Sequence, residues 1–365
     1  MSLRPSIQQV LEGLRREGQV DELAESRARS TLEVHQRTST ASPWFVKAFA
    51  AFGAWLSAVF LLSFFACVGL WKEEEVFAGV GIVLVIAAVA LRRTIQGVFL
   101  EQLTLALTLA GVGMAVAGLA HFGSDDAGIG ALLVISLTLL FVYPDATMRF
   151  LATLGAAGAG LYLLLRWVPG PGLDLGLLAC TGLLYWLFLQ QARLRTGKHG
   201  DLVGPVSFAL ACGLPAAMLT RLASFLDGSQ EGAMTLPMPL LTLGLTAITL
   251  YTAWHIMREH DLAPSGIHGA AVFAALTLVA VLTVHTPTVI CAVGLMALGF
   301  HRRSSLMVGI ATAFLLASGA WYYYDLSVTL LAKALALMGS GVILLGLRLF
   351  LSRRFPQAPS PVEAR

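Results

Sequence analysis

The chain has 365 residues, of which 57% are hydrophobic and only 12% are charged, with a mean hydropathy of +0.78. Soluble domains carry about 25% charged residues, so this composition excludes an ordinary water-soluble protein and indicates one that is embedded in a lipid bilayer. The net charge of +3 gives no indication of a nucleic-acid partner.

Residues 1–43 form a polar segment that precedes the first apolar run. Apolar residues from Ile7 to Leu14 recur at helical spacing, and a second short helix is predicted from Asp21 to Val34. Amphipathic helices of this kind lie on a membrane surface or dock a partner, and a solvated cytoplasmic extension is the simpler alternative. Because no signal peptide precedes Trp44, we expect the helix that begins there to direct insertion and to stay in the mature protein.

Apolar runs separated by short loops predict an all-α transmembrane bundle of about twelve spans from residue 44 onward. Crossing the hydrocarbon core takes about 20 helical residues, so the two weakest segments, 76–91 and 286–300, leave ten or eleven spans open. The predicted segments are 44–70, 76–91, 99–120, 127–143, 149–167, 173–191, 202–220, 236–256, 267–284, 286–300, 304–322 and 326–350.

The placement of basic residues predicts that both termini are cytoplasmic. Lys and Arg accumulate in cytoplasmic loops of membrane proteins. If the N-terminus is inside and the spans alternate, all but four of the 24 basic residues lie on the inner side. The exceptions are Lys72, Arg166 and Arg221 on the outer side and Lys333 within a span. The organisation predicted is therefore a cytoplasmic segment 1–43, a transmembrane domain 44–351 and a cytoplasmic tail 352–365.

The most unusual polar cluster is an aromatic run that ends in Tyr323, Tyr324 and Asp325, eight residues before Lys333. Ionisable side chains inside a membrane are costly, and such residues are functional candidates for that reason. A buried ion pair between Asp325 and Lys333 is one interpretation. The alternative is an interfacial aromatic belt followed by a lysine whose side chain extends toward the interface.

Three further residues are candidates. Glu101 and Gln102 open the third predicted span, where a carboxylate either handles protons or cations or marks the inner interface. Pro215 is a candidate helix break in mid-membrane, as in transporter binding sites, and a simple kink is the alternative. The four cysteines lie far apart in apolar runs, so no metal site, cofactor or catalytic set is predicted.

Several stretches resemble a bacterial membrane family catalogued as domain of unknown function 4401. They are Ser42–Lys47 (SPWFVK), Gly53–Leu56 (GAWL), Phe99–Leu103 (FLEQL), Trp321–Tyr324 (WYYY) and Thr329–Lys333 (TLLAK). The resemblance implies a multi-pass protein of the bacterial inner membrane, encoded beside a second membrane protein that is named for a Gly-Asp-Tyr motif. It implies a membrane partner and carries no catalytic residues.

Three functions are compatible with the sequence. The favoured one is a non-enzymatic component of a membrane complex. The first alternative is a secondary transporter or permease for a small solute, whose polar residues would converge near the midplane. The second alternative is an intramembrane enzyme acting on lipid, although the sequence shows no convergent set of acid, base and metal ligands. A partner protein would show scattered polar residues and an aromatic or Gly-rich face toward the lipid.

Overall fold

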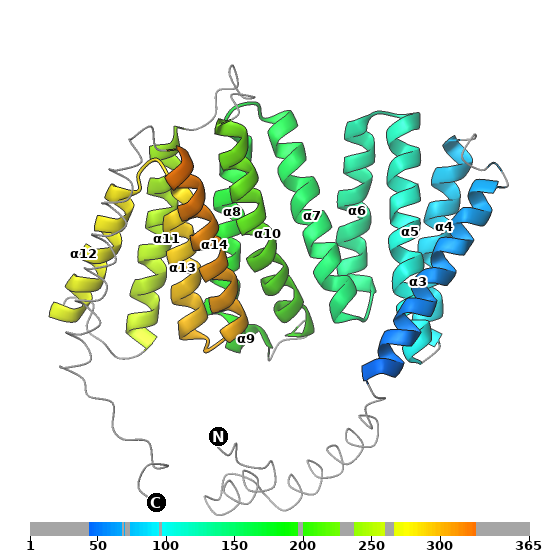
Figure 1. The fold of residues 1–365 in the computed structure, drawn as a ribbon, viewed down its shortest axis with the longest axis horizontal. Coiled ribbons are helices and arrows are strands. Elements are labelled where there is room, and N and C mark those ends of the chain that lie inside the picture. The colour runs from blue at the N-terminus through cyan, green and yellow to red at the C-terminus, as the bar shows by residue number, and fades with distance from the viewer. Residues whose placement is uncertain are drawn as a thin grey trace, which may run out of the picture. The chain divides into compact units, whose positions relative to one another are not determined.

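The computed structural model describes residues 44–67, 69, 74–94, 97–195, 200–226, 237–259 and 266–325. All regular structure in these ranges is helical (Figure 1). The helices are α3 (Trp44–Cys67), α4 (Glu74–Thr94), α5 (Val98–Phe122), α6 (Asp125–Val142), α7 (Ala146–Trp167), α8 (Gly172–Leu189), α9 (Gln191–Arg195), α10 (Gly200–Leu226), α11 (Met238–Glu259), α12 (Ile267–Leu282), α13 (Pro287–His301) and α14 (Ser305–Asp325). The chain divides into unit 1, Met1–Phe122, and unit 2, Gly123–Arg365.

The described helices are those of a membrane protein. Seven of them, α4 to α8, α10 and α11, contain stretches long and apolar enough to cross a bilayer, and four shorter apolar stretches lie in α3, α12, α13 and α14. Each predicted segment from 44–70 to 304–322 coincides with one of these helices. Segment 326–350 and the terminal segments 1–43 and 352–365 lie outside the described residues. Twelve spans and two cytoplasmic termini stay predictions.

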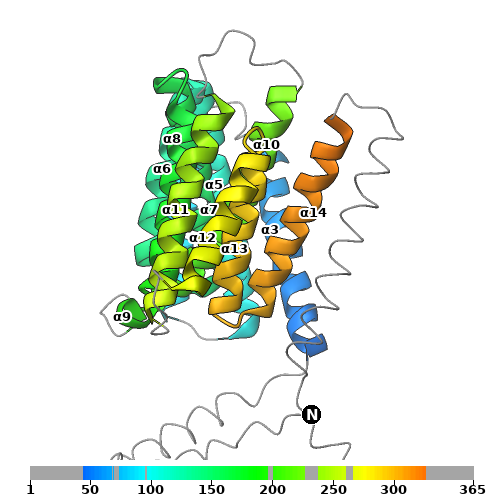
Figure 2. The same ribbon diagram turned by 90° about the vertical axis from the view of Figure 1, so that its left-hand side faces the viewer.

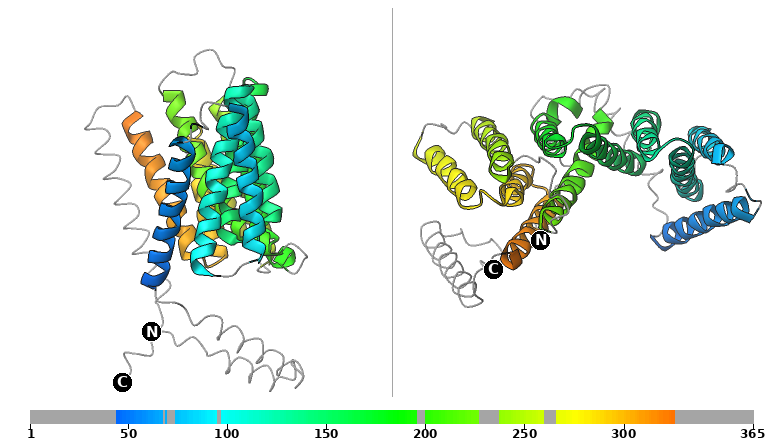
Figure 3. Two further views of the ribbon diagram at one scale, coloured as in Figure 1. Left: turned by 90° about the vertical axis from the view of Figure 1, so that its right-hand side faces the viewer. Right: turned by 90° about the horizontal axis from the view of Figure 1, so that it is seen from above.

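Within unit 1, small residues bring α4 and α5 into close contact (Figure 3). A Cβ atom added to Gly81 would lie 2.5 Å from the backbone nitrogen of Ala115 and 2.7 Å from the carbonyl oxygen of Gly111. One added to Gly118 would lie 2.7 Å from the Ala78 backbone nitrogen. Small residues permit this backbone approach, which maximises van der Waals contact where lipid offers no hydrophobic driving force.

The third helix of unit 1, α3, packs on α5 through its smallest side chains. Ala54 and Ala58 are buried, and a Cβ atom on Gly53 would lie 3.7 Å from the ring of Phe99 on α5. Residues four apart share one helix face, so these alanines define the inner side of α3. The opposite side of this helix carries large apolar side chains.

Unit 2 is organised around α8, α10, α11 and α13, with α7 against α10 and α14 against α13 (Figure 2). Its core is a single cluster of buried apolar side chains that comes from six helices, α8 and α10 to α14. Fully buried members include Leu177, Leu184, Leu241, Leu245, Ile290 and Leu295. Side-chain caps begin two of the outer helices, since the Asp145 carboxylate accepts from the backbone N–H groups of Thr147 and Met148, and Ser124 accepts from Ala127.

The structure bears on four sequence-based predictions. Helix α10 continues through Pro215, so this residue does not break the helix, although it cannot donate to the Ala211 carbonyl. Helix α4 has 21 residues, which resolves segment 76–91 as a full-length candidate span. Helix α13 has only 15 residues and stays among the shorter apolar stretches. The backbone of α14 runs on through Asp325, beyond the predicted end at residue 322.

Candidate functional site

A buried ion pair joins α8 to α10 within unit 2. The Nε atom of Arg221 lies 3.0 Å from Oδ1 of Asp174, and Nη2 lies 3.5 Å from Oδ2. The arginine side chain is 2% exposed and the aspartate side chain 0%. Two N–H groups therefore face two carboxylate oxygens, the geometry in which a charged hydrogen bond is most directional. The pair fixes α8 against α10 near one end of the unit.

One helix end favours the negative charge of this pair. Asp174 lies in the first turn of α8, where the partial positive charge of the helix N-terminus stabilises a carboxylate. Arg221 lies more than one turn before Leu226, the last residue of α10, so its charge is compensated by Asp174 rather than by a helix end. Burying either ion without the other would be unfavourable, because the desolvation penalty is several kcal/mol per ion.

No sequence pattern links Asp174 to Arg221, because the two residues are 47 positions apart. One signal was present, since Arg221 and Arg166 are among the few basic residues predicted on the outer side. Arg166 also has a carboxylate partner, with its Nε atom 3.6 Å from Oδ1 of Asp126. A basic residue that departs from the positive-inside pattern is thus a reason to search for an acidic neighbour on a nearby helix.

The opposite end of unit 2 holds a second set of polar contacts, where α8, α11 and α13 end. Arg302 follows α13, and its Nη2 atom donates to the carbonyl oxygen of Phe188 at 2.6 Å. Nε2 of His301 lies 3.3 Å from Oε2 of Glu259, the last residue of α11. The Arg258 guanidinium lies 4.8 Å from the ring centre of Trp254. Cationic groups near helix C-termini complement the exposed carbonyl groups there.

Between these ends, the polar groups of unit 2 are mostly hydroxyls that bond to backbone carbonyls. Tyr185 on α8 donates to the carbonyl of Cys291 on α13 at 3.3 Å. A Cβ atom added to Gly294 would clash with the Tyr185 hydroxyl, so the glycine makes room for it. The Thr242 hydroxyl lies 2.7 Å from the carbonyl oxygen of Val284. These bonds tie α8 and α11 to the segment around α13.

Of the residues that the sequence proposed as sites, Glu101 and Gln102 lie in unit 1, and Tyr323, Tyr324 and Asp325 lie in unit 2. Glu101 pairs with Arg92, with Oε1 3.2 Å from Nη2, and is 45% exposed, as expected for a carboxylate that marks a helix end. Gln102 follows it on α5 and is half-buried. Tyr323, Tyr324 and Asp325 form the backbone end of α14, and Lys333 lies outside the described residues, so the predicted Asp325–Lys333 pair stays a prediction.

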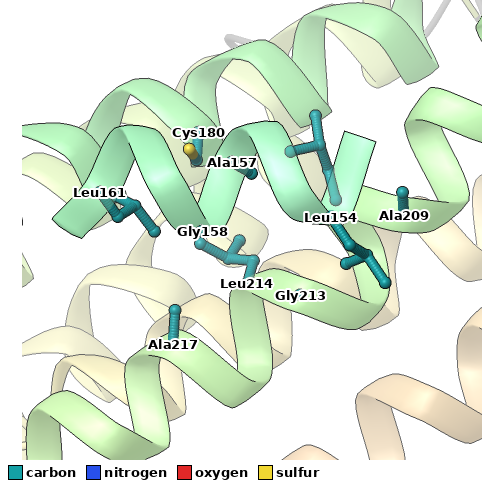
Figure 4. A pocket seen from close by; sticks show the side chains of 10 residues that line it. Leu154, Ala157, Gly158, Leu161, Cys180, Ala209, Gly213, Leu214 and Ala217 are labelled. Carbon is teal, nitrogen blue, oxygen red and sulfur yellow. The ribbon is translucent and has the colours of Figure 1, made fainter. Parts of the chain in front are cut away.

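An apolar cavity of about 130 Å³ lies between α7, α8 and α10 (Figure 4). Leu154, Gly158 and Leu161 of α7 form one wall, and the other comes from residues of α10 that include Gly213 and Leu214, immediately before Pro215. Cys180 is the residue that α8 contributes. The cavity therefore lies beside the proline that the sequence singled out, although the helix is not broken there.

No group of His, Cys, Asp or Glu side chains in the described part of the chain is arranged to hold a metal ion. A family model, described as Domain of unknown function (DUF4401), matches residues 43–354. No curated protein and no solved structure matches the chain.

Proposed function

This chain belongs to the DUF4401 family, and from that premise we propose that it is a non-enzymatic subunit of a membrane complex whose partner is a second multi-pass membrane protein. The family description names no activity, so the proposal depends on the chain's own surfaces and polar groups. A bacterial inner-membrane location and a partner encoded nearby are part of this proposal.

The observation that carries the proposal is an aromatic face on α3. Phe49, Phe52, Phe60 and Phe64 are 60% to 75% exposed. At 3.6 residues per turn they lie within an arc of about 120°, opposite the alanines that pack on α5. Lipid tails are as apolar as leucine, so helices associate in a bilayer through specific packing rather than hydrophobicity. Aromatic pairs contribute about 0.5–1.5 kcal/mol beyond area burial, which suits this face to a partner helix.

The arrangement of charges also supports a subunit role. The ion pairs between described residues, Asp174–Arg221, Asp126–Arg166, Glu101–Arg92 and Glu259–His301, lie at or near helix ends. Nearer mid-helix, most hydroxyls of the described residues bond to the carbonyl one turn earlier in their own helix, as Thr181 and Thr249 do, whereas Tyr185 and Thr242 bond to carbonyls outside their helices. Polar groups that are scattered rather than gathered at one site are compatible with a structural subunit.

A secondary transporter is the second candidate, and one observation favours it. Helix α10 carries Pro205 and Pro215 and also holds Arg221 of the buried ion pair. A helix with two prolines and one charged contact to a neighbour is suited to move. A transporter would bind a solute in the isolated chain.

An intramembrane enzyme, the third candidate, would need an acid, a base and a cleft at one interface.

The subunit proposal is tested by co-purification from native membranes in mild detergent. We expect one membrane protein to elute with the tagged chain in a fixed ratio. Replacing Phe52 and Phe60 together by alanine should lower the recovered partner about tenfold or more, because two aromatic contacts of ~1 kcal/mol each are lost.

The matched control is the double alanine variant of Val281 and Leu282 on α12, which are also highly exposed. It should retain the partner at the wild-type ratio. Elution of the wild-type chain alone, as a single species that is stabilised by a small solute, would instead support transport.

A further inference from the structure

We propose that the cavity between α7, α8 and α10 binds the methyl end of a membrane lipid's acyl chain. This inference is independent of the subunit proposal, because it concerns the interior of unit 2. The wall residues are Leu, Ala and Gly apart from the Cys180 thiol. Dry aliphatic cavities of about 150 Å³ bind benzene-sized apolar molecules, and this one, of about 130 Å³, is of similar size.

The height of the cavity identifies the ligand class. Its lining residues, Leu154–Leu161 on α7, Cys180 on α8 and Ala209–Ala217 on α10, lie at the middle of helices that run from 146 to 167, 172 to 189 and 200 to 226. All three helices are long and apolar enough to span a bilayer. The middle of a spanning helix lies at the centre of the hydrocarbon core, which is the level reached by the ends of acyl chains.

The cavity has an entrance on the lipid side. Gly158 both lines the cavity and is exposed, and a Cβ atom added there would meet nothing within 4 Å. The missing side chain therefore leaves an opening at Gly158, which is labelled in Figure 4 among the other lining residues. The inner wall includes Leu210 and Leu214, which are only 6% and 4% exposed. Lipid that merely surrounds the protein does not reach these two residues.

The test uses the purified full chain in vesicles that contain a phospholipid with a diazirine near the methyl end of one acyl chain. After illumination, mass spectrometry locates the adducts. We expect adducts on Leu210 and Leu214, together with adducts on Leu183, a 46% exposed residue near the middle of α8 that serves as the internal standard. A phospholipid with its diazirine beside the headgroup should not label Leu210 or Leu214.

Two variants distinguish an acyl chain that enters the cavity from one that only contacts the surface around it. Gly158→Leu should lower the Leu210 and Leu214 adducts about tenfold relative to Leu183, a change equivalent to losing the burial of roughly two methylene groups. Gly160→Leu is the matched control, because a Cβ atom there also meets nothing within 4 Å and Gly160 does not line the cavity.

The labelling pattern of the wild-type chain tests the proposal even if a variant folds poorly. Adducts restricted to exposed residues, with none on Leu210 or Leu214, would overturn the proposal. Equal labelling of those two residues in Gly158→Leu and in Gly160→Leu would overturn it as well, since entry would then not pass the Gly158 opening.

Discussion

Replacing Asp174 by asparagine is expected to destabilise unit 2 by about 3–5 kcal/mol, the cost of removing one member of a buried ion pair. Asparagine keeps the shape and an acceptor oxygen but removes the negative charge that lies 3.0 Å from the Arg221 guanidinium. The buried cation then lacks its carboxylate. Unfolding of the detergent-solubilised protein with increasing denaturing detergent measures the change.

A double substitution tests whether the loss of stability comes from the uncompensated charge of Arg221. Asp174→Asn combined with Arg221→Met should recover a large part of the lost stability, because no buried ion is left without its counter-ion. Asp126→Asn is the matched control, since it removes the carboxylate from an ion pair in which Arg166 is 67% exposed. Exposed pairs contribute about 0–1 kcal/mol, so this variant should resemble the wild type. Equal losses of stability in Asp174→Asn and Asp126→Asn would show that burial of the Asp174–Arg221 pair does not increase its contribution to stability.

Gly81→Leu is expected to separate α4 from α5 and to cost about 3 kcal/mol or more, the upper range for overpacking. The first atom of the new side chain would lie 2.5 Å from a backbone nitrogen and 2.7 Å from a backbone oxygen of α5. Backbone atoms of a packed helix do not move aside as a flexible side-chain end does, so the helices must shift. Resistance of the α4–α5 connection to proteolysis in vesicles reports the change.

The control for this prediction lies two residues away on the same helix. A Cβ atom added to Gly79 would meet nothing within 4 Å, and the residue is exposed. Gly79→Leu should therefore retain wild-type proteolytic resistance, and Gly113→Leu offers the same comparison on α5. If Gly79→Leu and Gly81→Leu were equally sensitive to proteolysis, the close approach of α4 and α5 at Gly81 would not explain the effect.

Helix positions were predictable from this sequence because each spanning helix is a long apolar run. The segments 99–120 and 149–167 match α5 and α7 to within a few residues at each end. Helix ends were harder, since α14 extends through Asp325 although polar and aromatic residues indicated a boundary there. For Pro215 the sequence left a helix break and a simple kink open, and α10 continues through this proline, as membrane helices often do.

Contacts between helices were not predictable in the same way. Which faces meet depends on packing, and apolar helices have few features that distinguish one face from another. Asp174 and Arg221 therefore stayed unlinked across 47 positions, whereas Glu101 and Arg92, at two ends of one short loop, could be expected to lie near each other. The cavity likewise depends on the packing of three helices, and no local sequence pattern predicts it.

The subunit proposal is tested most directly by photo-crosslinking in native membranes from single positions on α3. A photo-reactive amino acid at Phe52 or at Phe60 should form an adduct with one protein of defined mass that differs from this chain. The same amino acid at Val134, an exposed residue of α6, should yield lipid adducts. Lipid adducts alone at all three positions, or an adduct between two copies of this chain, would contradict a distinct membrane partner on the aromatic face of α3.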